Sequence, residues 1–338
     1  MRIIIAGAGE IGFYLSQMLA KESHDIVVID KNRDILNWVD SHTDVITTCG
    51  DSTSIKTLQE AGADRADLLI AVTQLQETNL LIAAIGKQLG AKKTIARVDN
   101  SEYLRTDIDV NFEILGIDSL IYPKCLAAQE IDWVLKQATA KSAVEFEDGK
   151  LILIEMTIEK DAPIDNKTMV EIGQMNIGLD FRIVAVAHQG KTIIPHGYDK
   201  VHEGDRIFIV VNRESTDELI NLTGNQKIII KDIMILGGSR LGVKIAQQLQ
   251  NYYSVKLIED DRKKCVELAN FLTNTLVLHG DGRDMDFLME ENIDKMDAFI
   301  AVTGDSETNM LTCLSVKEKG VKKTIALIEN MSYTISSN

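Results

Sequence analysis

A glycine-rich segment close to the N-terminus has the residue types and spacing that bind phosphate groups. Gly7, Gly9 and Gly12 form a G-x-G-x-x-G pattern directly after the apolar run 3–6. Where such a pattern joins a strand to a helix, the first glycine permits the tight turn. The second lets the backbone approach a pyrophosphate, and the third lets helix and strand pack closely. Because the helix start also offers free N–H groups to an anion, we predict a dinucleotide site on Gly7, Ala8, Gly9, Glu10, Ile11 and Gly12.

An acid follows the second apolar run at the distance expected for a ribose contact. Asp30 ends the run 26–29, about 20 residues after the glycine pattern, where a carboxylate can accept hydrogen bonds from a ribose diol. Such an acid disfavours the extra phosphate of NADP. The neighbouring cations Lys31 and Arg33 soften that preference.

Further polar residues follow or end later apolar runs. They are Asp51 with Ser52, Thr73 with Gln74, and Arg97. In an open parallel sheet the carboxyl ends of the strands meet at one edge, where ligands bind. Asp51 is suited to accept from an adenine amino group, Thr73 to line the pyrophosphate, and Arg97 to reach a phosphate. Each alone is explained as well by a helix cap or a solvated loop, whereas the set favours a nucleotide.

The elements that must position these residues occur twice. Residues 3–12 read IIIAGAGEIG and residues 233–242 read IMILGGSRLG, and the KKTIA of residues 92–96 recurs at 322–326. In each copy short buried runs alternate with helical patterns, which indicates β-α-β units and a doubly wound parallel sheet.

In the first copy we expect strands at 2–6, 26–29, 44–47, 68–72, 94–98, 112–115 and 119–121. The expected helices lie around 10–21, 31–40, 53–61 and 77–89, and a further helix runs from Pro123 to about Gln137.

The residues between the copies have a different texture. Apolar β-rich runs occupy 151–154, 182–186 and 206–211, with one short helix expected near 168–174. The predicted fold is therefore α/β, with two Rossmann-like doubly wound domains flanking a small α+β domain. The predicted domain ranges are 1–140, 141–224 and 231–338.

The second copy departs from the first at its candidate site, which comprises Gly237, Gly238, Ser239, Arg240 and Leu241. Ser239 stands where the middle glycine should be, and its Cβ would crowd the approach of a pyrophosphate.

Other positions of the second site change as well. Glu259 replaces Asp30, while Arg97 becomes Leu327. We expect weaker or altered nucleotide selectivity in the second copy, with a phosphate on Arg240.

Charge and composition exclude several classes of function. Lys and Arg number 36 against 51 Asp and Glu, and this net charge of −15 is unsuited to nucleic acid. No apolar run reaches the ~18–20 residues of a membrane span. The four cysteines and six histidines lack metal-ligand spacing. The middle domain presents no clear acid or base for catalysis, so we predict no enzyme, no catalytic residues and no metal.

Taken together, these motifs resemble the TrkA family of RCK (KTN-type) proteins, cytosolic regulatory subunits of bacterial Trk potassium uptake systems. The resemblance rests on GAGEIG with Asp30, on Asp51, on the AVT ending at Thr73, on Arg97, and on the duplicated unit. It implies an RCK-N, RCK-C, RCK-N order along essentially the whole chain.

The resemblance also implies a function. RCK-N units bind NAD(H) and adenine nucleotides (ATP, ADP or AMP) and pair into dimers or, at full length, tetrameric rings. The ring docks on a membrane potassium-translocating, TrkH-like subunit, so the expected location is cytoplasmic and peripheral on the inner face of the plasma membrane. By position the first site would use Gly7, Gly9, Glu10, Ile11, Asp30, Asp51, Thr73 and Arg97, and the second Gly237, Ser239, Arg240, Leu241, Glu259, Asp281 and Thr303.

Family members usually carry two full N–C pairs, and we therefore expect this chain, which ends at Asn338, to be a truncated form. The alternatives are an NAD-dependent oxidoreductase with a duplicated Rossmann unit, and an RCK regulator of another cation channel or efflux system.

Overall fold

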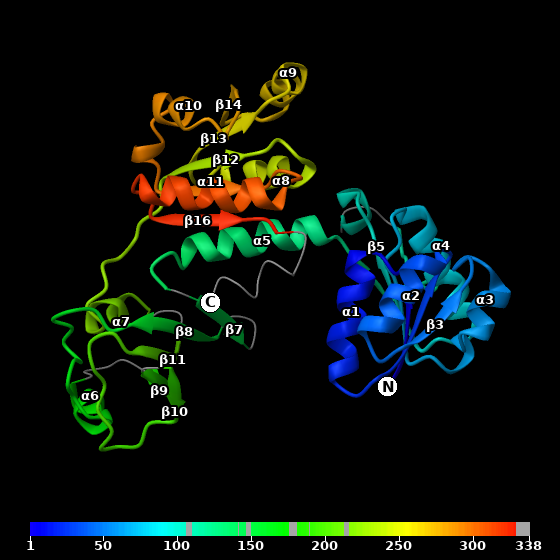
Figure 1. Cartoon of the computed structure of the whole chain (residues 1–338), viewed down its shortest axis with the longest axis horizontal. Coiled ribbons are helices and arrows are strands. Elements are labelled where there is room, and N and C mark those ends of the chain that lie inside the picture. Colours follow the sequence, from blue (N-terminus) through cyan, green and yellow to red (C-terminus); the bar gives the residue numbers. More distant parts are fainter. Residues whose placement is uncertain are drawn as a thin grey trace. The chain divides into compact units, whose positions relative to one another are not determined.

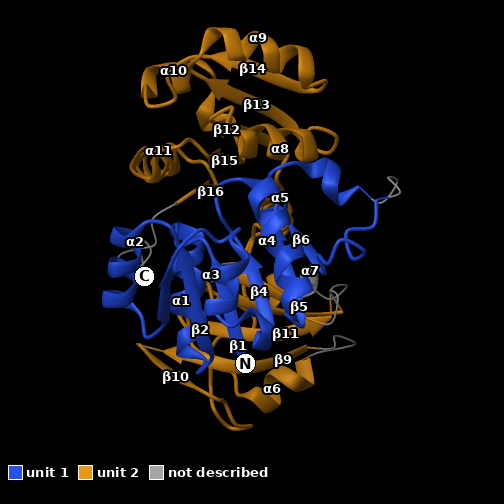
Figure 2. Cartoon of the chain, turned by 90° about the vertical axis from the view of Figure 1, so that its right-hand side faces the viewer, with its two compact units in different colours: residues 1–127, 329–338 blue, residues 128–328 orange. Residues whose placement is uncertain are grey.

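The computed structural model describes residues 1–105, 110–140, 142–146, 150–175, 181–188, 190–212 and 216–328. It contains two compact units, one with residues 1–127 and one with residues 128–328, and each is described by itself (Figures 1 and 2). None of the helices in these ranges has the length and apolar character needed to span a membrane.

The first unit is built on a six-stranded parallel sheet with the order β3-β2-β1-β4-β5-β6. Its strands are β1 (Arg2–Ala6), β2 (Asp25–Asp30), β3 (Ile46–Cys49), β4 (Leu68–Ala71), β5 (Lys93–Arg97) and β6 (Ser119–Ile121). The central strands are continuous apolar runs because helices cover both faces of a parallel sheet. Ile3 and Ile5 belong to one buried cluster and Ile4 to another, as the two-residue period of a strand requires.

Five α-helices belong to the described residues of this region, and two of them begin at clear start signals in the sequence. The five are α1 (Glu10–Lys21), α2 (Arg33–His42), α3 (Ile55–Glu60), α4 (Gln76–Leu89) and α5 (Pro123–Lys136), with 3-10 turns η1 (Ala63–Arg65) and η2 (Ser101–Leu104). The Asn32 side chain caps α2 by accepting from the N–H groups of Asp34 and Ile35. Pro123 occupies the first position of α5, where its missing N–H costs nothing.

One predicted strand is wrong. Residues 112–116 form a turn, closed by bonds from the N–H groups of Leu115 and Ile117 to the carbonyl of Phe112. Gly116 takes a φ of +82°, a left-handed conformation that ends extended backbone. The apolar residues that suggested a strand include Ile114, which is 81% exposed.

The second unit contains an antiparallel sheet with the order β10-β9-β11-β8-β7. Its strands are β7 (Ser142–Phe146), β8 (Leu151–Thr157), β9 (Phe181–His188), β10 (Lys191–Ile193) and β11 (Arg206–Asn212), accompanied by the helices α6 (Met169–Met175) and α7 (Thr216–Leu222). Ile152, Ile154, Ile207 and Ile209 form the centre of its core. The predicted α+β character of the middle region is confirmed.

The same unit contains a second parallel sheet, with the order β14-β13-β12-β15-β16. Its strands are β12 (Asp232–Leu236), β13 (Ser254–Glu259), β14 (Thr275–His279), β15 (Ala298–Ala301) and β16 (Lys323–Ala326). Its helices are α8 (Arg240–Leu249), α9 (Arg262–Phe271), α10 (Met285–Glu290), η4 (Ile293–Lys295) and α11 (Ser306–Glu318). This order repeats β3-β2-β1-β4-β5, so the duplication read from the sequence is a duplication of topology.

Each of the three sheets lies inside one of the predicted ranges 1–140, 141–224 and 231–338. We keep these ranges as a proposal for three separately folding domains. The last ten residues of the third range lie outside the described part of the chain.

Candidate nucleotide-binding sites

The first unit has an open cavity at the carboxyl ends of β1, β2, β3 and β4. Its volume is about 510 Å³, within the range of small-molecule sites. Eight predicted site residues line it, namely Gly7, Gly9, Asp30, Lys31, Asp51, Ser52, Thr73 and Gln74. The strand order reverses between β1 and β4, the position where open α/β sheets bind ligands.

The three glycines of the first loop differ in what surrounds them. A Cβ on Gly12 would lie 1.8 Å from the carbonyl oxygen of Gly7, and one on Gly7 would lie 2.9 Å from the backbone nitrogen of Thr73. Gly7 also has a φ of +108°, which disfavours any other residue. A Cβ on Gly9 would meet nothing within 4 Å. The fold therefore requires Gly7 and Gly12, while Gly9 leaves open space beside the cavity.

Gly9 is also the N-cap residue of α1, and no side chain caps this helix end. The first N–H groups of a helix have no partner within the helix and attract anions. No described side chain caps these groups, and Gly9 at the helix start lines the cavity, so this helix end is suited to a phosphate group.

Asp30 connects the glycine loop to the end of β2. One carboxylate oxygen accepts from the N–H of Ala8 and the other from the N–H of Asn32, each at 2.8 Å. An ionised carboxylate offers about four acceptor positions. Among the described residues two of these are used, so Asp30 retains capacity for a ribose diol.

Asp51 is held by Thr53, whose N–H and hydroxyl donate to the same carboxylate oxygen at 2.8 and 2.7 Å. These bonds lower the pKa of Asp51 below its ordinary value. The carboxylate is therefore charged at neutral pH and available as an acceptor for an amino group of a base.

Thr73 is fixed by the buried side chain of Asn79. The Thr73 N–H and hydroxyl both donate to Asn79 Oδ1 at 2.7 Å, while Asn79 Nδ2 donates to the carbonyls of Thr73 and Arg97. We call this arrangement the asparagine clamp. In the second copy Asn309 makes the same bonds to Thr303 and Leu327. The segment Glu-Thr-Asn occurs at residues 77–79 and again at 307–309, and its asparagine holds the threonine that lines each cavity.

Five predicted residues do not line the first cavity: Ala8, Glu10, Ile11, Gly12 and Arg97. The Arg97 guanidinium lies 3.4 Å from the carboxylate of Asp99, which also pairs with Lys124. Arg97 is therefore not brought to the cavity that Asp30 and Thr73 line.

The sequence reasoning missed Ile35, on the first turn of α2, together with Asn32, Thr53, Val72, Leu75 and Thr78. Ile35 also packs partly against the apolar core. Its position in the first helical turn after Asp30 is the sequence signal that would have placed it at the cavity.

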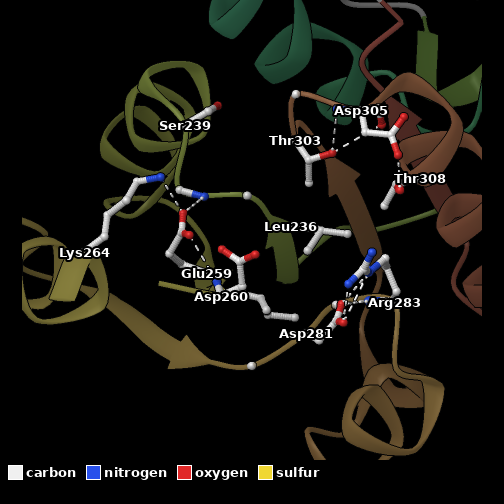
Figure 3. A pocket seen from close by; sticks show the side chains of 16 residues that line it. Leu236, Ser239, Glu259, Asp260, Lys264, Asp281, Arg283, Thr303, Asp305 and Thr308 are labelled. Atoms are coloured by element: carbon white, nitrogen blue, oxygen red, sulfur yellow. Dashed lines mark hydrogen bonds and ion pairs between the residues drawn. The ribbon is translucent and has the colours of Figure 1, made fainter. Parts of the chain in front are cut away.

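The second copy has a corresponding cavity of about 380 Å³ (Figure 3). The predicted residues that line it are Gly237, Gly238, Ser239, Glu259, Asp281 and Thr303, whereas Arg240 and Leu241 lie outside its lining. The sequence reasoning missed the two cations at this cavity, Lys264 and Arg283.

Ser239 occupies the place of Gly9 and caps its helix. Its hydroxyl donates to the carbonyl of Val302 at 3.0 Å and accepts from the N–H of Gly242 at 3.2 Å. A helix N–H that no described side chain caps in the first copy therefore has a side-chain partner in the second.

Glu259 is buried with four donors around it. It accepts from the N–H groups of Gly238, Asp260 and Asp261 at 3.0 to 3.1 Å and pairs with Lys264 at 2.7 Å. Burial raises the pKa of Glu259, but the bond from Lys264 and those at Asp260 and Asp261 outweigh it and hold the pKa at about 2. Figure 3 shows Lys264 reaching from α9 to this carboxylate.

Across the cavity, Asp281 forms a two-pronged ion pair with Arg283. Nε and Nη2 of Arg283 lie 2.9 and 2.8 Å from the two carboxylate oxygens, and this pairing lowers the pKa of Asp281. Arg283 stands at the position of Thr53 in the first copy.

Comparison with known proteins agrees with this duplicated arrangement. A family model described as the TrkA-N domain matches residues 3–123 and again 233–336, and one described as the TrkA-C domain matches residues 153–224. The chain belongs to the TrkA family.

The chain is 32% identical over 336 residues to the Trk system potassium uptake protein TrkA of Vibrio alginolyticus, covering 98% of this chain and 73% of the relative. It is 35% identical over 334 residues to a TrkA homolog of Archaeoglobus fulgidus, covering 98% of this chain and 75% of the relative.

Among solved structures, the RCK domain of GsuK superposes with a TM-score of 0.62 at 18% identity, over 96% of this chain and 73% of that one. The GsuK channel bound to NAD gives a TM-score of 0.61 at 18% identity, over 96% of this chain and 61% of that one. These likenesses show that the chain has an RCK fold.

Proposed function

We propose that this chain is a regulatory subunit of a potassium uptake system and that its first cavity binds NAD(H) or an adenine nucleotide. The relatives named above are Trk potassium uptake proteins, and GsuK structures are described as bound to NAD and to ADP. The observation that carries the proposal is local. Gly9 leaves room beside uncapped helix N–H groups, and Asp30, bonded to the neighbouring Ala8, has two acceptor positions that no described residue uses.

In this function the nucleotide is a signal and is not consumed. The chain acts in the cytosol as a homo-oligomer against a membrane potassium-translocating, TrkH-like subunit. A bound nucleotide shifts the equilibrium between two arrangements of the oligomer only by the difference in its affinity for them. A site that holds ribose and pyrophosphate supplies such a difference when its lining differs between the two arrangements.

Calorimetry with NADH, NAD and ATP on the full chain and on Gly9→Ala tests the site. Because a Cβ at Gly9 meets nothing within 4 Å, this variant keeps its fold while obstructing a pyrophosphate. We expect at least a tenfold loss of affinity for NADH and an unchanged melting temperature. Gly173→Ala is the matched control, since a Cβ there also meets nothing within 4 Å and the residue lies in α6.

A second experiment tests the regulatory role. In cells lacking their own Trk regulatory subunit, the wild-type chain should change potassium uptake and Gly9→Ala should change it less. Equal NADH affinity of both proteins would remove the proposed site. Turnover of NADH with a panel of small carbonyl compounds would instead favour an oxidoreductase.

A further inference from the structure

The two cavities share one framework, and three of the aligned positions at which their linings differ carry this inference. Gly9 corresponds to Ser239, and Thr53 to Arg283. Ile35 and Lys264 are each the third residue of the helix that follows the second strand of their sheet. In the first cavity these positions are small, apolar or neutral. In the second each carries a group that bonds to the cavity's own wall.

Among the described residues, Asp30 uses two of its acceptor positions, whereas the corresponding acid of the second copy, Glu259, uses about all of them. Glu259 receives four donors, three of them backbone N–H groups and the fourth the ammonium of Lys264. These donors account for about all the lone-pair sites of a carboxylate. Lys264 therefore stands where the ribose hydroxyls would donate at the first site.

The helix N-terminus shows the same difference. The hydroxyl of Ser239 accepts a hydrogen bond from the N–H of Gly242. The aligned residue of the first copy is Gly12, in a helix whose start no described side chain caps. A pyrophosphate entering the second cavity would have to displace this hydroxyl and approach past the Cβ of Ser239.

The wall where an adenine would lie is also self-paired, because both oxygens of Asp281 are engaged by Arg283. The remaining carboxylates at this cavity are Asp260 and Asp305, and Asp305 accepts from the hydroxyl of Thr308. Counted with the cations Lys264 and Arg283, the lining of the second cavity is one charge more negative than that of the first, and this charge opposes a pyrophosphate.

We propose that Lys264 and Ser239 are specificity-determining residues that substitute for ribose and pyrophosphate in the second cavity and so confine dinucleotide binding to the first. The inference rests on the proposed function of the first site. It assigns different roles to the copies. The first cavity binds NAD(H), whereas the second keeps the same backbone framework and binds no dinucleotide.

The test transplants first-copy residues into the second cavity of the full chain. The triple variant Ser239→Gly, Glu259→Asp, Lys264→Ile reproduces the first-copy residues Gly9, Asp30 and Ile35. In that copy Asp30 forms no ion pair with a described residue, so the shorter carboxylate is suited to a site without the lysine. Calorimetry with NADH should give one site per wild-type chain and two per triple-variant chain. Lys263→Ile, an exposed neighbour on the same helix that does not line the cavity, is the control and should keep one site.

The reverse transplant tests the same idea in the first cavity. Gly9→Ser with Ile35→Lys should lower NADH affinity at least tenfold, because the new lysine can pair with Asp30. Gly9→Ser with Ile35→Met, which has similar bulk and no charge, should lose less. The difference between the two variants isolates the contribution of the ammonium group.

The outcomes separate this inference from the proposed function. A wild-type chain that binds two NADH with similar affinity overturns the inference and leaves the function intact. A folded triple variant that still binds one NADH also overturns it. If the wild-type chain binds none, the proposed function fails, and gain of one site by the triple variant would still support the roles of Lys264 and Ser239.

Discussion

The two glycine-loop cavities are built alike and are completed differently. Both depend on a glycine packed against a carbonyl oxygen and on an asparagine clamp. The first leaves an acid and a helix end open, whereas the second satisfies both with Lys264 and Ser239. The difference teaches that a repeated framework can be retained while its ligand contacts are replaced by internal ones.

The largest expected effect concerns the shared framework. A Cβ on Gly12 or Gly242 would lie 1.8 or 2.0 Å from a backbone oxygen. Gly12→Ala and Gly242→Ala should each destabilise their own domain by more than about 4 kcal/mol. Hydrogen exchange resolved by peptide would localise the loss. If either variant keeps wild-type hydrogen-exchange protection in its domain, that domain does not require glycine at this position.

The strand-end acids should differ in their contribution to stability. Glu259→Gln leaves Lys264 without its buried partner and should lower the free energy of unfolding by about 3 kcal/mol. Asp30→Asn breaks no ion pair of the described residues and should cost about 1 kcal/mol. Urea unfolding of both variants measures this. Equal costs would contradict the assignment of a structural role to one acid and a ligand role to the other.

The low pKa of Glu259 predicts a pH dependence confined to the second cavity. Its folded pKa of about 2 lies below the ordinary 4.5, so its stabilising contribution is present above pH 4.5 and is lost as the pH falls toward 2. The neighbouring carboxylate of Glu259 raises the pKa of Asp260, whose contribution has the opposite sign.

The stability difference between wild type and Glu259→Gln should therefore shrink by about 2 kcal/mol between pH 7 and pH 3. Thermal unfolding across this pH series reports the net effect of the pair. A difference that is constant with pH would show that Glu259 gains nothing from its charge.

The smallest effect separates the two helix starts. Ser239→Ala removes a side-chain cap and should destabilise the second copy by about 1 kcal/mol. Gly9→Ala removes none and should change stability by less than about 0.5 kcal/mol. Melting temperatures compared under one buffer distinguish these values. A large loss in Gly9→Ala would mean that this glycine serves the fold and not a ligand.

Much of the frame was predictable from the sequence because its signals are local. Apolar runs and glycine spacing placed the strands and loops of both sheets, and strand-end position brought Asp30, Asp51 and Thr73 to one cavity. The strand expected at 112–115 was wrong because a glycine with positive φ closes a turn there.

The missed residues depend on tertiary geometry. Lys264 contributes from a helix turn five residues after Glu259, and its importance is visible only when four donors are counted around one carboxylate. Arg97 ends a strand as expected, yet its guanidinium pairs with Asp99 and does not reach the cavity. Such competition between nearby partners has no linear sequence pattern.

The asparagine clamp gives each cavity one stiff side, and in the first cavity it faces an adaptable helix start. Asn79 ties the backbone after β4 to the last carbonyl of β5, so Thr73 cannot shift without pulling on Arg97. At Gly9 of the glycine loop, no described side chain caps the helix and a Cβ would meet nothing within 4 Å. The clamp therefore couples the two strand ends mechanically: a displacement of Thr73 is transmitted through Asn79 to the end of the neighbouring strand β5.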